Sequence, residues 1–402
     1  MIRAIIYLTF ILLAMQIGAQ EEEPTMTEAD LKAALIENVR SQNAGNNAFA
    51  LELYNRLKSK PGNIFCSPFS VSSALVLPYA GSAGPTQAQF HTVLRYLTQE
   101  DNLYASFAWL NQHFTTPWYS GPNETRLYIG NSLWVQRDIR ILPRFQNIAS
   151  KYFKSSLQRT DFMRNPESSR LSINNWVREK TQGHIDQIMG PGEINANTRL
   201  VVVSSIFMRA VWERAFDPNL TAPSSFFADQ ANTISIPMMT TTGNFPLYQG
   251  DSFTMLELPY RAGEGSQTQF SFLVFLPKNT FGLSSVENQV LNTSLESLLK
   301  LLRIDRVITF FPKFKILNEF QLNGTLQQMG MFEAFSENAD FSGIDGSRDL
   351  SLSQVIHKAY LSIDEKGTEA VAATAVTLEN KSYVNHSPII FKADHPLSLI
   401  HI

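Results

Sequence analysis

The chain has 402 residues, 44% of them hydrophobic, so it is long and apolar enough to bury a large core. Its 33 basic and 36 acidic side chains give a net charge of -3 without clustering, which argues against nucleic acid or an anionic membrane as a partner. Residues 87–114 offer only Arg95, His91 and His113 as cations, and we therefore expect no strong heparin site.

Residues 1–20 have the pattern of a secretory signal peptide. Arg3 precedes an apolar run from Ala4 to Ala14, and the small residues Gly18 and Ala19 come before an acidic stretch. No later segment reaches the ~20 apolar residues that a membrane-spanning helix needs. We therefore expect a secreted, extracellular protein. Asn-x-Ser/Thr triplets fit this route, and the candidate glycosylation sites are Asn123, Asn219, Asn292 and Asn323.

The only cysteine, Cys66, cannot form an internal disulfide, so the fold must depend on core burial. Its apolar surroundings favour a buried structural thiol over a reactive one. The seven histidines show no His-Glu-x-x-His motif and no cysteine pairing, so we expect no metal and no other cofactor.

Apolar periodicity predicts the elements in chain order. Helical spacing predicts helices over residues 27–57, from Ser67 and Pro68 onward, and over 107–114, 144–153 and 171–189. Pro78 should kink or end the second of these helices. Segments rich in β-branched and aromatic residues predict strands over 127–135, 200–207, 270–276 and 307–311. With no linker and no repeat, residues 21–402 are predicted to form a single α+β domain.

The segment from Asp364 to Leu378 is unusual because it carries no charge after Glu369. With a period of two, one face consists only of small or apolar residues: Thr368, Ala370, Ala372, Thr374, Val376 and Leu378. That face can enter a core, and no proline before Pro388 blocks ladder hydrogen bonds. Since alanine has no strong strand preference, the segment can also remain outside a sheet.

This segment resembles the hinge of the serpin family. The similar residues are Glu365, Gly367, Thr368, Glu369, Ala370, Val371, Ala372, Ala373 and Thr374. Other family motifs appear in the family's order, at residues 63–70, 173–177, 181–185, 206–208, 212–214, 256–260, 312–314, 339–343 and 357–359. The resemblance covers nearly everything after the signal peptide.

The resemblance implies a serpin fold, with helices on a large central sheet, smaller sheets and an exposed reactive-centre loop. It implies a monomeric inhibitor that forms a covalent complex with a serine protease when its cut loop enters the sheet. Counting from Glu365 puts the scissile bond between Lys381 and Ser382, which suits a trypsin-like protease. Counting back from Phe391 allows Tyr383 and a chymotrypsin-like target. A cysteine-protease target, or a non-inhibitory carrier, chaperone or storage protein, remains an alternative.

The resemblance also implies two structural clusters. Lys313 and Glu365 match an ion pair near Trp212, at the end of the sheet where the loop begins to insert, which we call the breach. His357, Ser67 and Ser70 match the shutter, which ties together the strands that must part. Ser204 stands where many members carry the asparagine that bonds this histidine, so the resemblance does not carry that bond over.

The sequence gives little support for an enzyme. His184, Asp186, Ser204 and Ser205 are the residues from which a triad could be assembled, but no Gly-x-Ser-x-Gly motif accompanies either serine. We therefore expect no catalysis.

The C-terminal end departs from the family pattern. Family members continue past the equivalent of His395 and Pro396 through two further strands, whereas this sequence reads Leu397-Ser-Leu-Ile-His-Ile402. We expect about two dozen residues, or two strands, to be missing, and residues 397–402 to be a sequencing artefact.

Overall fold

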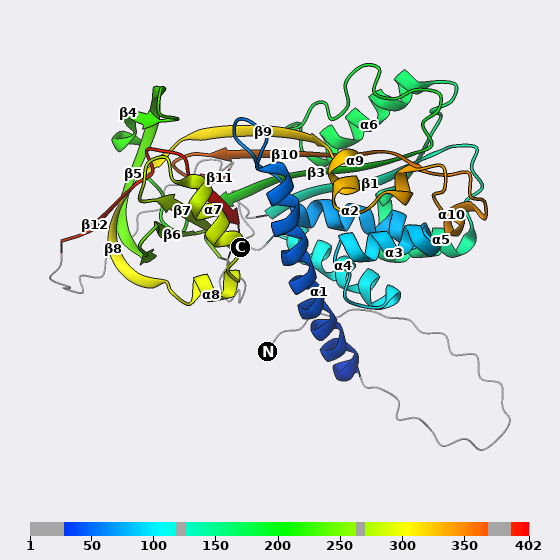
Figure 1. Cartoon of the computed structure of the whole chain (residues 1–402), viewed down its shortest axis with the longest axis horizontal. Helices are drawn as coiled ribbons and strands as arrows, with labels where there is room; N and C mark the ends of the chain where they lie inside the picture. The colour runs from blue at the N-terminus through cyan, green and yellow to red at the C-terminus, as the bar shows by residue number, and fades with distance from the viewer. Residues whose placement is uncertain (1–27, 118–125, 263–269, 369–386, 402) are drawn as a thin grey trace.

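The computed structural model describes residues 28–117, 126–262, 270–368 and 387–401. Figure 1 shows long strands running through the middle, with helices on both sides. The helices are α1 (Glu28–Leu57), α2 (Pro68–Gly81), α3 (Gly84–Val93), α4 (Glu100–Thr115), α5 (Pro143–Tyr152), α6 (Pro166–Lys180), α7 (Leu283–Leu291), α8 (Leu295–Leu299), α9 (Asn323–Gln328) and α10 (Ser342–Asp345).

The strands fall into two sheets. They are β1 (Arg126–Gln136), β2 (Leu157–Thr160), β3 (Leu200–Val211), β4 (Ala222–Phe227), β5 (Thr233–Gln249), β6 (Phe253–Pro259), β7 (Ser271–Pro277), β8 (Arg303–Pro312), β9 (Phe314–Gln321), β10 (Leu352–Ile363), β11 (Gly367–Thr368), β12 (Ile389–Lys392) and β13 (Ser398–His401). Within the described residues, the main sheet has the order β2-β1-β3-β11-β10-β9. The second sheet has the order β12-β8-β5-β6-β7-β13, with β4 paired to β5.

The centre of the main sheet is a parallel pair formed by β3 and β10. The pairing runs from Leu200 beside Leu352 to Phe207 beside Tyr360. At one end, the two-residue strand β11 lies between them and is antiparallel to both. We call the line between β3 and β10 the seam, the end at β11 its upper end, and the end at Leu200 and Leu352 its lower end.

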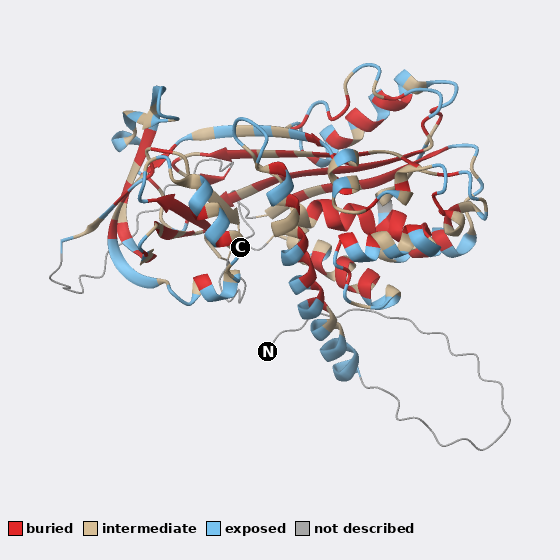
Figure 2. Ribbon diagram, viewed as in Figure 1, coloured by how far each residue is buried: buried red, intermediate tan, exposed pale blue. Residues whose placement is uncertain are grey.

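Both faces of the central strands β3 and β10 are covered, as Figure 2 shows by their burial. On the inner face, Val202 and Val355 join the core cluster that includes α2 and α4. On the outer face, Val203 and Ile356 join a cluster under α6. Strands buried on both faces read as continuous apolar runs, which explains the sequence of β3.

The predicted α+β class is confirmed, and most predicted elements are present. Ser67 caps α2 by accepting a hydrogen bond from the backbone N–H of Ser70 at 3.2 Å. Of the two predicted effects of Pro78, ending the helix is wrong, because α2 continues to Gly81. Most of α2 is buried, and the packing of its neighbours compensates for the bond that proline cannot donate.

The prediction of a helix as far as residue 189 is also wrong, since α6 ends at Lys180. Gln182 and Gly183 have φ angles of 50° and 83°, which an α-helix cannot contain. The apolar pattern continues past the helix because Ile185, Ile188 and Met189 still pack into the outer cluster.

Residues 398–401, within the segment predicted to be artefactual, form β13 and pair with Phe272–Phe275 of β7. The origin of this segment stays a prediction.

Candidate functional site

The hinge begins inside the main sheet. Thr368 is fully buried beside Ala210 and Ile363, and its hydroxyl lies 2.7 Å from the hydroxyl of Tyr260. Gly367 has a φ of +154°, and a Cβ there would lie 2.0 Å from the carbonyl oxygen of Ala210. Only glycine therefore fits at the point where the chain turns from β10 back into the seam.

The breach residues surround this turn. Lys313 Nζ lies 2.6 Å from Glu365 Oε2, and the Thr221 hydroxyl donates to Glu365 Oε1 at 2.9 Å. The Trp212 indole donates to the carbonyl of Asp364 at 3.0 Å. Burial raises the pKa of Glu365, but its bonds from Lys313 and Thr221 outweigh that effect and hold it below the ordinary value. The carboxylate is thus ionised and fixed in position.

The shutter residues form a chain of hydrogen bonds across the seam. The backbone N–H of Ser67 donates to His357 Nε2 at 3.0 Å, and His357 Nδ1 lies 3.0 Å from the hydroxyl of Ser204. The Ser204 hydroxyl lies 2.9 Å from the Ser70 hydroxyl. The Ser70 hydroxyl in turn donates to Asn131 Oδ1 at 3.0 Å. The chain therefore links β10, β3, α2 and β1.

The direction of this chain follows from its first bond. Because Nε2 of His357 accepts from an N–H group, a neutral ring carries its proton on Nδ1 and donates it to Ser204. Ser204 then donates to Ser70, and Ser70 to Asn131. Ser204 therefore forms a hydrogen bond to His357 although it replaces the asparagine that many family members carry.

Sequence reasoning missed Asn131. This residue lies beside Ser204 in the pairing of β1 with β3, and its amide also donates to the carbonyl of Ser70 at 3.0 Å. A polar residue inside a buried apolar strand was the available signal.

The four residues considered for a triad do not come together. The ring of His184 lies against Phe207 and Tyr360 on the outer face, with centroid distances of 4.5 and 5.2 Å. Asp186 pairs with Arg178 at the surface. Ser204 instead belongs to the shutter, and Ser205 donates to the carbonyl of Gly130.

Cys66 keeps some exposed surface, but its thiol is enclosed, and burial raises its pKa to about 12. A thiol with so high a pKa is a poor nucleophile. Across the described ranges, no group of three or more His, Cys, Asp or Glu side chains could hold a metal ion. In the same ranges, every helix is too short or too polar to cross a bilayer.

Several candidate residues lie outside the described residues. They are the rest of the hinge (Glu369, Ala370, Val371, Ala372, Ala373 and Thr374), the expected scissile residues Lys381 and Ser382, the alternative Tyr383, and the sequon at Asn123.

The central strands β3 and β10 of the main sheet accept the start of the hinge between them at the upper end. Further down, buried His357 links the two strands through Ser204. This arrangement defines the class of protein. The model of the family described as Serpin (serine protease inhibitor) matches residues 44–401. The chain belongs to the serpin family.

Two relatives and one solved structure illustrate the range of similar proteins. An uncharacterized serpin-like protein of Thermococcus kodakarensis is 36% identical over 87% of this chain and 79% of its own. Leukocyte elastase inhibitor A of Rattus norvegicus is 33% identical, covering 88% of this chain and 95% of its own. Human thyroxine-binding globulin superposes with a TM-score of 0.79 at 30% identity, covering 91% of this chain and 95% of its own.

Acid should weaken the fold through His357. Burial lowers its pKa to about 4, whereas an unfolded histidine has a pKa of ~6.5. Between these values the unfolded chain binds a proton that the folded chain does not, so stability is complete above pH ~6.5 and falls toward pH ~4. The loss should be about 3 kcal/mol for this fully buried ring.

Urea unfolding of the wild type and of His357→Gln across this pH range measures the effect. The variant should be less stable at neutral pH and should show a shallower pH dependence. Buried His401, whose pKa is also lowered to about 4 by burial, remains in both proteins, so the difference in slope reports His357. Equal slopes would contradict the prediction.

Proposed function

We propose that this serpin is a secreted, monomeric inhibitor of a trypsin-like serine protease. The protease cuts between Lys381 and Ser382, and the residues after Thr368 then become a strand between β3 and β10. The observation that carries the proposal is β11, which already occupies the upper end of the seam with the direction that such a strand requires.

The register of β11 extends without conflict. Gly367 and Thr368 lie opposite Val211 and Ala210, so a continued antiparallel strand would bring Glu369 opposite Arg209 and Val371 opposite Phe207. On the other side, Ile363 lies opposite Thr368, so Val371 would meet Tyr360. Since Phe207 and Tyr360 are already paired neighbours, one strand can satisfy both edges at once.

Side-chain chemistry favours the same register. Glu369 would face Arg209, whose Nε is buried without an acceptor among the described residues. The even-numbered residues from Ala370 onward would point to the inner face, as Thr368 does, and all of them up to Leu378 are small or apolar. The charge of Glu369 would thus lie on the outer face, and the small side chains would lie in the core.

The energy of insertion is large enough to act on a protease. Ten residues, 369–378, would form ladder hydrogen bonds at ~1 kcal/mol each, which gives about 10 kcal/mol. That is comparable to the stability of a whole domain. A protease still esterified to the loop would be displaced, and a shift of ~1 Å in its catalytic groups can cost a factor of about 100 in rate. Insertion therefore competes with deacylation.

The alternative class is a non-inhibitory serpin, such as a carrier, and thyroxine-binding globulin is a similar protein with a binding function in its name. The small inward residues of the hinge favour insertion and hence inhibition. Chymotrypsin-like and cysteine proteases are the alternative targets.

Incubation with trypsin should give an SDS-resistant covalent adduct, with cleavage after Lys381. Lys381→Ala should abolish adduct formation with trypsin, because the cation that the protease binds is removed. Tyr383→Ala is the matched control and should leave the adduct unchanged. Electrophoresis and mass mapping of the cut measure both results. An adduct formed with chymotrypsin after Tyr383, and none with trypsin, would refute the assignment.

Thr368→Arg should convert the inhibitor into a substrate. The position is fully buried between β3 and β10, so an unpaired guanidinium there opposes closure of the sheet around the loop. We expect the yield of covalent complex to fall at least about tenfold while cleavage continues. Thr368→Val, similar in size and uncharged, should retain most of the yield. An undiminished yield from the arginine variant would count against insertion.

We also propose export, with glycans on Asn219 and Asn292, which are both exposed. Asn323 is a poor acceptor because its amide donates to the carbonyl of Ser353 and accepts from the backbone N–H of Val355. Peptide mapping of protein secreted by eukaryotic cells, before and after glycosidase treatment, should find Asn219 and Asn292 modified and Asn323 bare. A glycan on Asn323, or retention of the protein inside the cells, would contradict this.

A further inference from the structure

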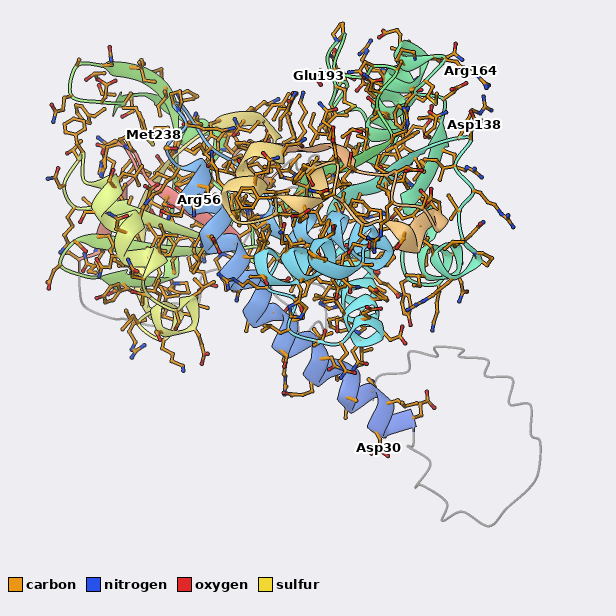
Figure 3. All side chains as sticks on the ribbon, turned by 45° about the vertical axis from the view of Figure 1, so that its right-hand side comes forward. Asp30, Arg56, Asp138, Arg164, Glu193 and Met238 are labelled. Carbon is orange, nitrogen blue, oxygen red and sulfur yellow. The ribbon has the colours of Figure 1, made fainter. Side chains whose placement is uncertain are left out.

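A polar cavity lies at the lower end of the seam, opposite to the hinge. It has a volume of about 200 Å³ and is lined by Glu193, Asn195, Asn197, Thr198, Ser353 and Gln354. These residues come from the segment between α6 and β3 and from the start of β10, and Figure 3 labels Glu193 on that segment. The pairing of β3 with β10 is irregular here, with a register shift between Leu352 and Gln354.

The lining has hydrogen-bonding capacity that the described residues do not use. Gln354 Oε1 is enclosed and has no donor among them. A buried carbonyl oxygen without a donor costs free energy, so a ligand that brings an N–H group to it would be stabilised.

Glu193 supplies the only formal charge in the lining. Its oxygens accept from the side chain of Gln321 at 2.9 Å and from the backbone N–H of Gly190 at 3.1 Å. Two cations lie in this region: Arg170 is held by a bidentate bond to Glu167, and Arg199 donates to the carbonyls of Ala196 and Thr198. Within the described chain Glu193 forms no ion pair, so the cavity favours a polar ligand with a positive charge.

The register of β11 identifies a segment of this chain that would reach the cavity. Each residue added to the strand moves one residue back along β3, so Leu378 would lie opposite Leu200. The next three residues, Glu379, Asn380 and Lys381, would then leave the strand beside Arg199 and the turn at residues 195–198. Asn195, Asn197 and Thr198 of this turn line the cavity.

From this geometry we propose that the cavity binds the polar end of the cut loop, with the ammonium group of Lys381 paired to Glu193. The inference rests on the proposed function. It means that a basic residue at position 381 would be recognised twice, once by the protease and once by a site on the inhibitor itself. A cut after Tyr383 would leave Lys381 at the same place in this register and add Ser382 and Tyr383 beyond it.

The accessibility of Lys381 in the cleaved protein tests the proposal. Full-length protein is cut with trypsin, the released cleaved form is purified, and carboxypeptidase B is used to remove the new C-terminal lysine. Removal should be at least about tenfold slower than from a peptide of residues 375–381, which corresponds to ~1.4 kcal/mol of protection. Glu193→Gln should restore most of the rate, and Glu337→Gln, which changes an exposed carboxylate outside the cavity, should not.

Thermal melting separates failure of this inference from failure of the proposed function. A cleaved form no more stable than the intact chain would mean that no strand is inserted, which overturns the proposed function. A stabilised cleaved form from which Lys381 is removed equally fast in the wild type and in Glu193→Gln would overturn only the binding of the loop end. Slow removal in the wild type, fast removal in Glu193→Gln and equal melting temperatures of the two intact proteins support the proposal.

Discussion

The parallel pairing of β3 with β10 is the interaction on which the other features of this molecule depend. Parallel ladders are slightly weaker per residue than antiparallel ones, and a strand placed between these two would be antiparallel to both. Separating them to admit such a strand would therefore replace one weaker ladder with two stronger ones. The breach fixes the upper end of the pair, the chain of hydroxyl groups from His357 ties its middle, and the polar cavity lies at its lower end. The functional residues thus follow one line through the fold.

The closed state is held by few specific contacts on that line. Among the described residues, the hydrogen bond between His357 and Ser204 joins a side chain of β10 to a side chain of β3, while the bond from Ser70 to Asn131 lies between α2 and β1. In the proposed opening of the seam, Ser204 would keep its bond to Ser70, so His357 would lose one partner while the other hydrogen bonds of the chain would remain. With no internal disulfide to hold the strands together, burial and this short chain of bonds oppose opening.

Local signals were readable from the sequence, and long-range contacts were not. The Ser67 cap and the apolar periodicity of α1 and β3 depend on neighbouring residues, so the pattern predicted them. The end of α6 was missed because Ile185 and Ile188 are buried after the helix has ended, and burial alone preserves an apolar pattern. The bond from Ser204 to His357 and the cavity each join residues more than 150 positions apart, and only the pairing of β3 with β10 brings them together.

The close approach of Gly367 to the carbonyl of Ala210 has an evolutionary consequence. In the proposed mechanism, that contact sets the starting point from which every later residue is counted, so the length of the segment up to Lys381 fixes where the cut end would lie. Inserting or deleting a single residue would exchange the two faces of the strand, turning Val371 inward and Ala370 and Ala372 outward. It would also carry the loop end past the cavity or stop it short. In the proposed mechanism, target preference would therefore evolve by substitution at position 381, whereas the length of the segment before it would be under stronger constraint than its chemistry.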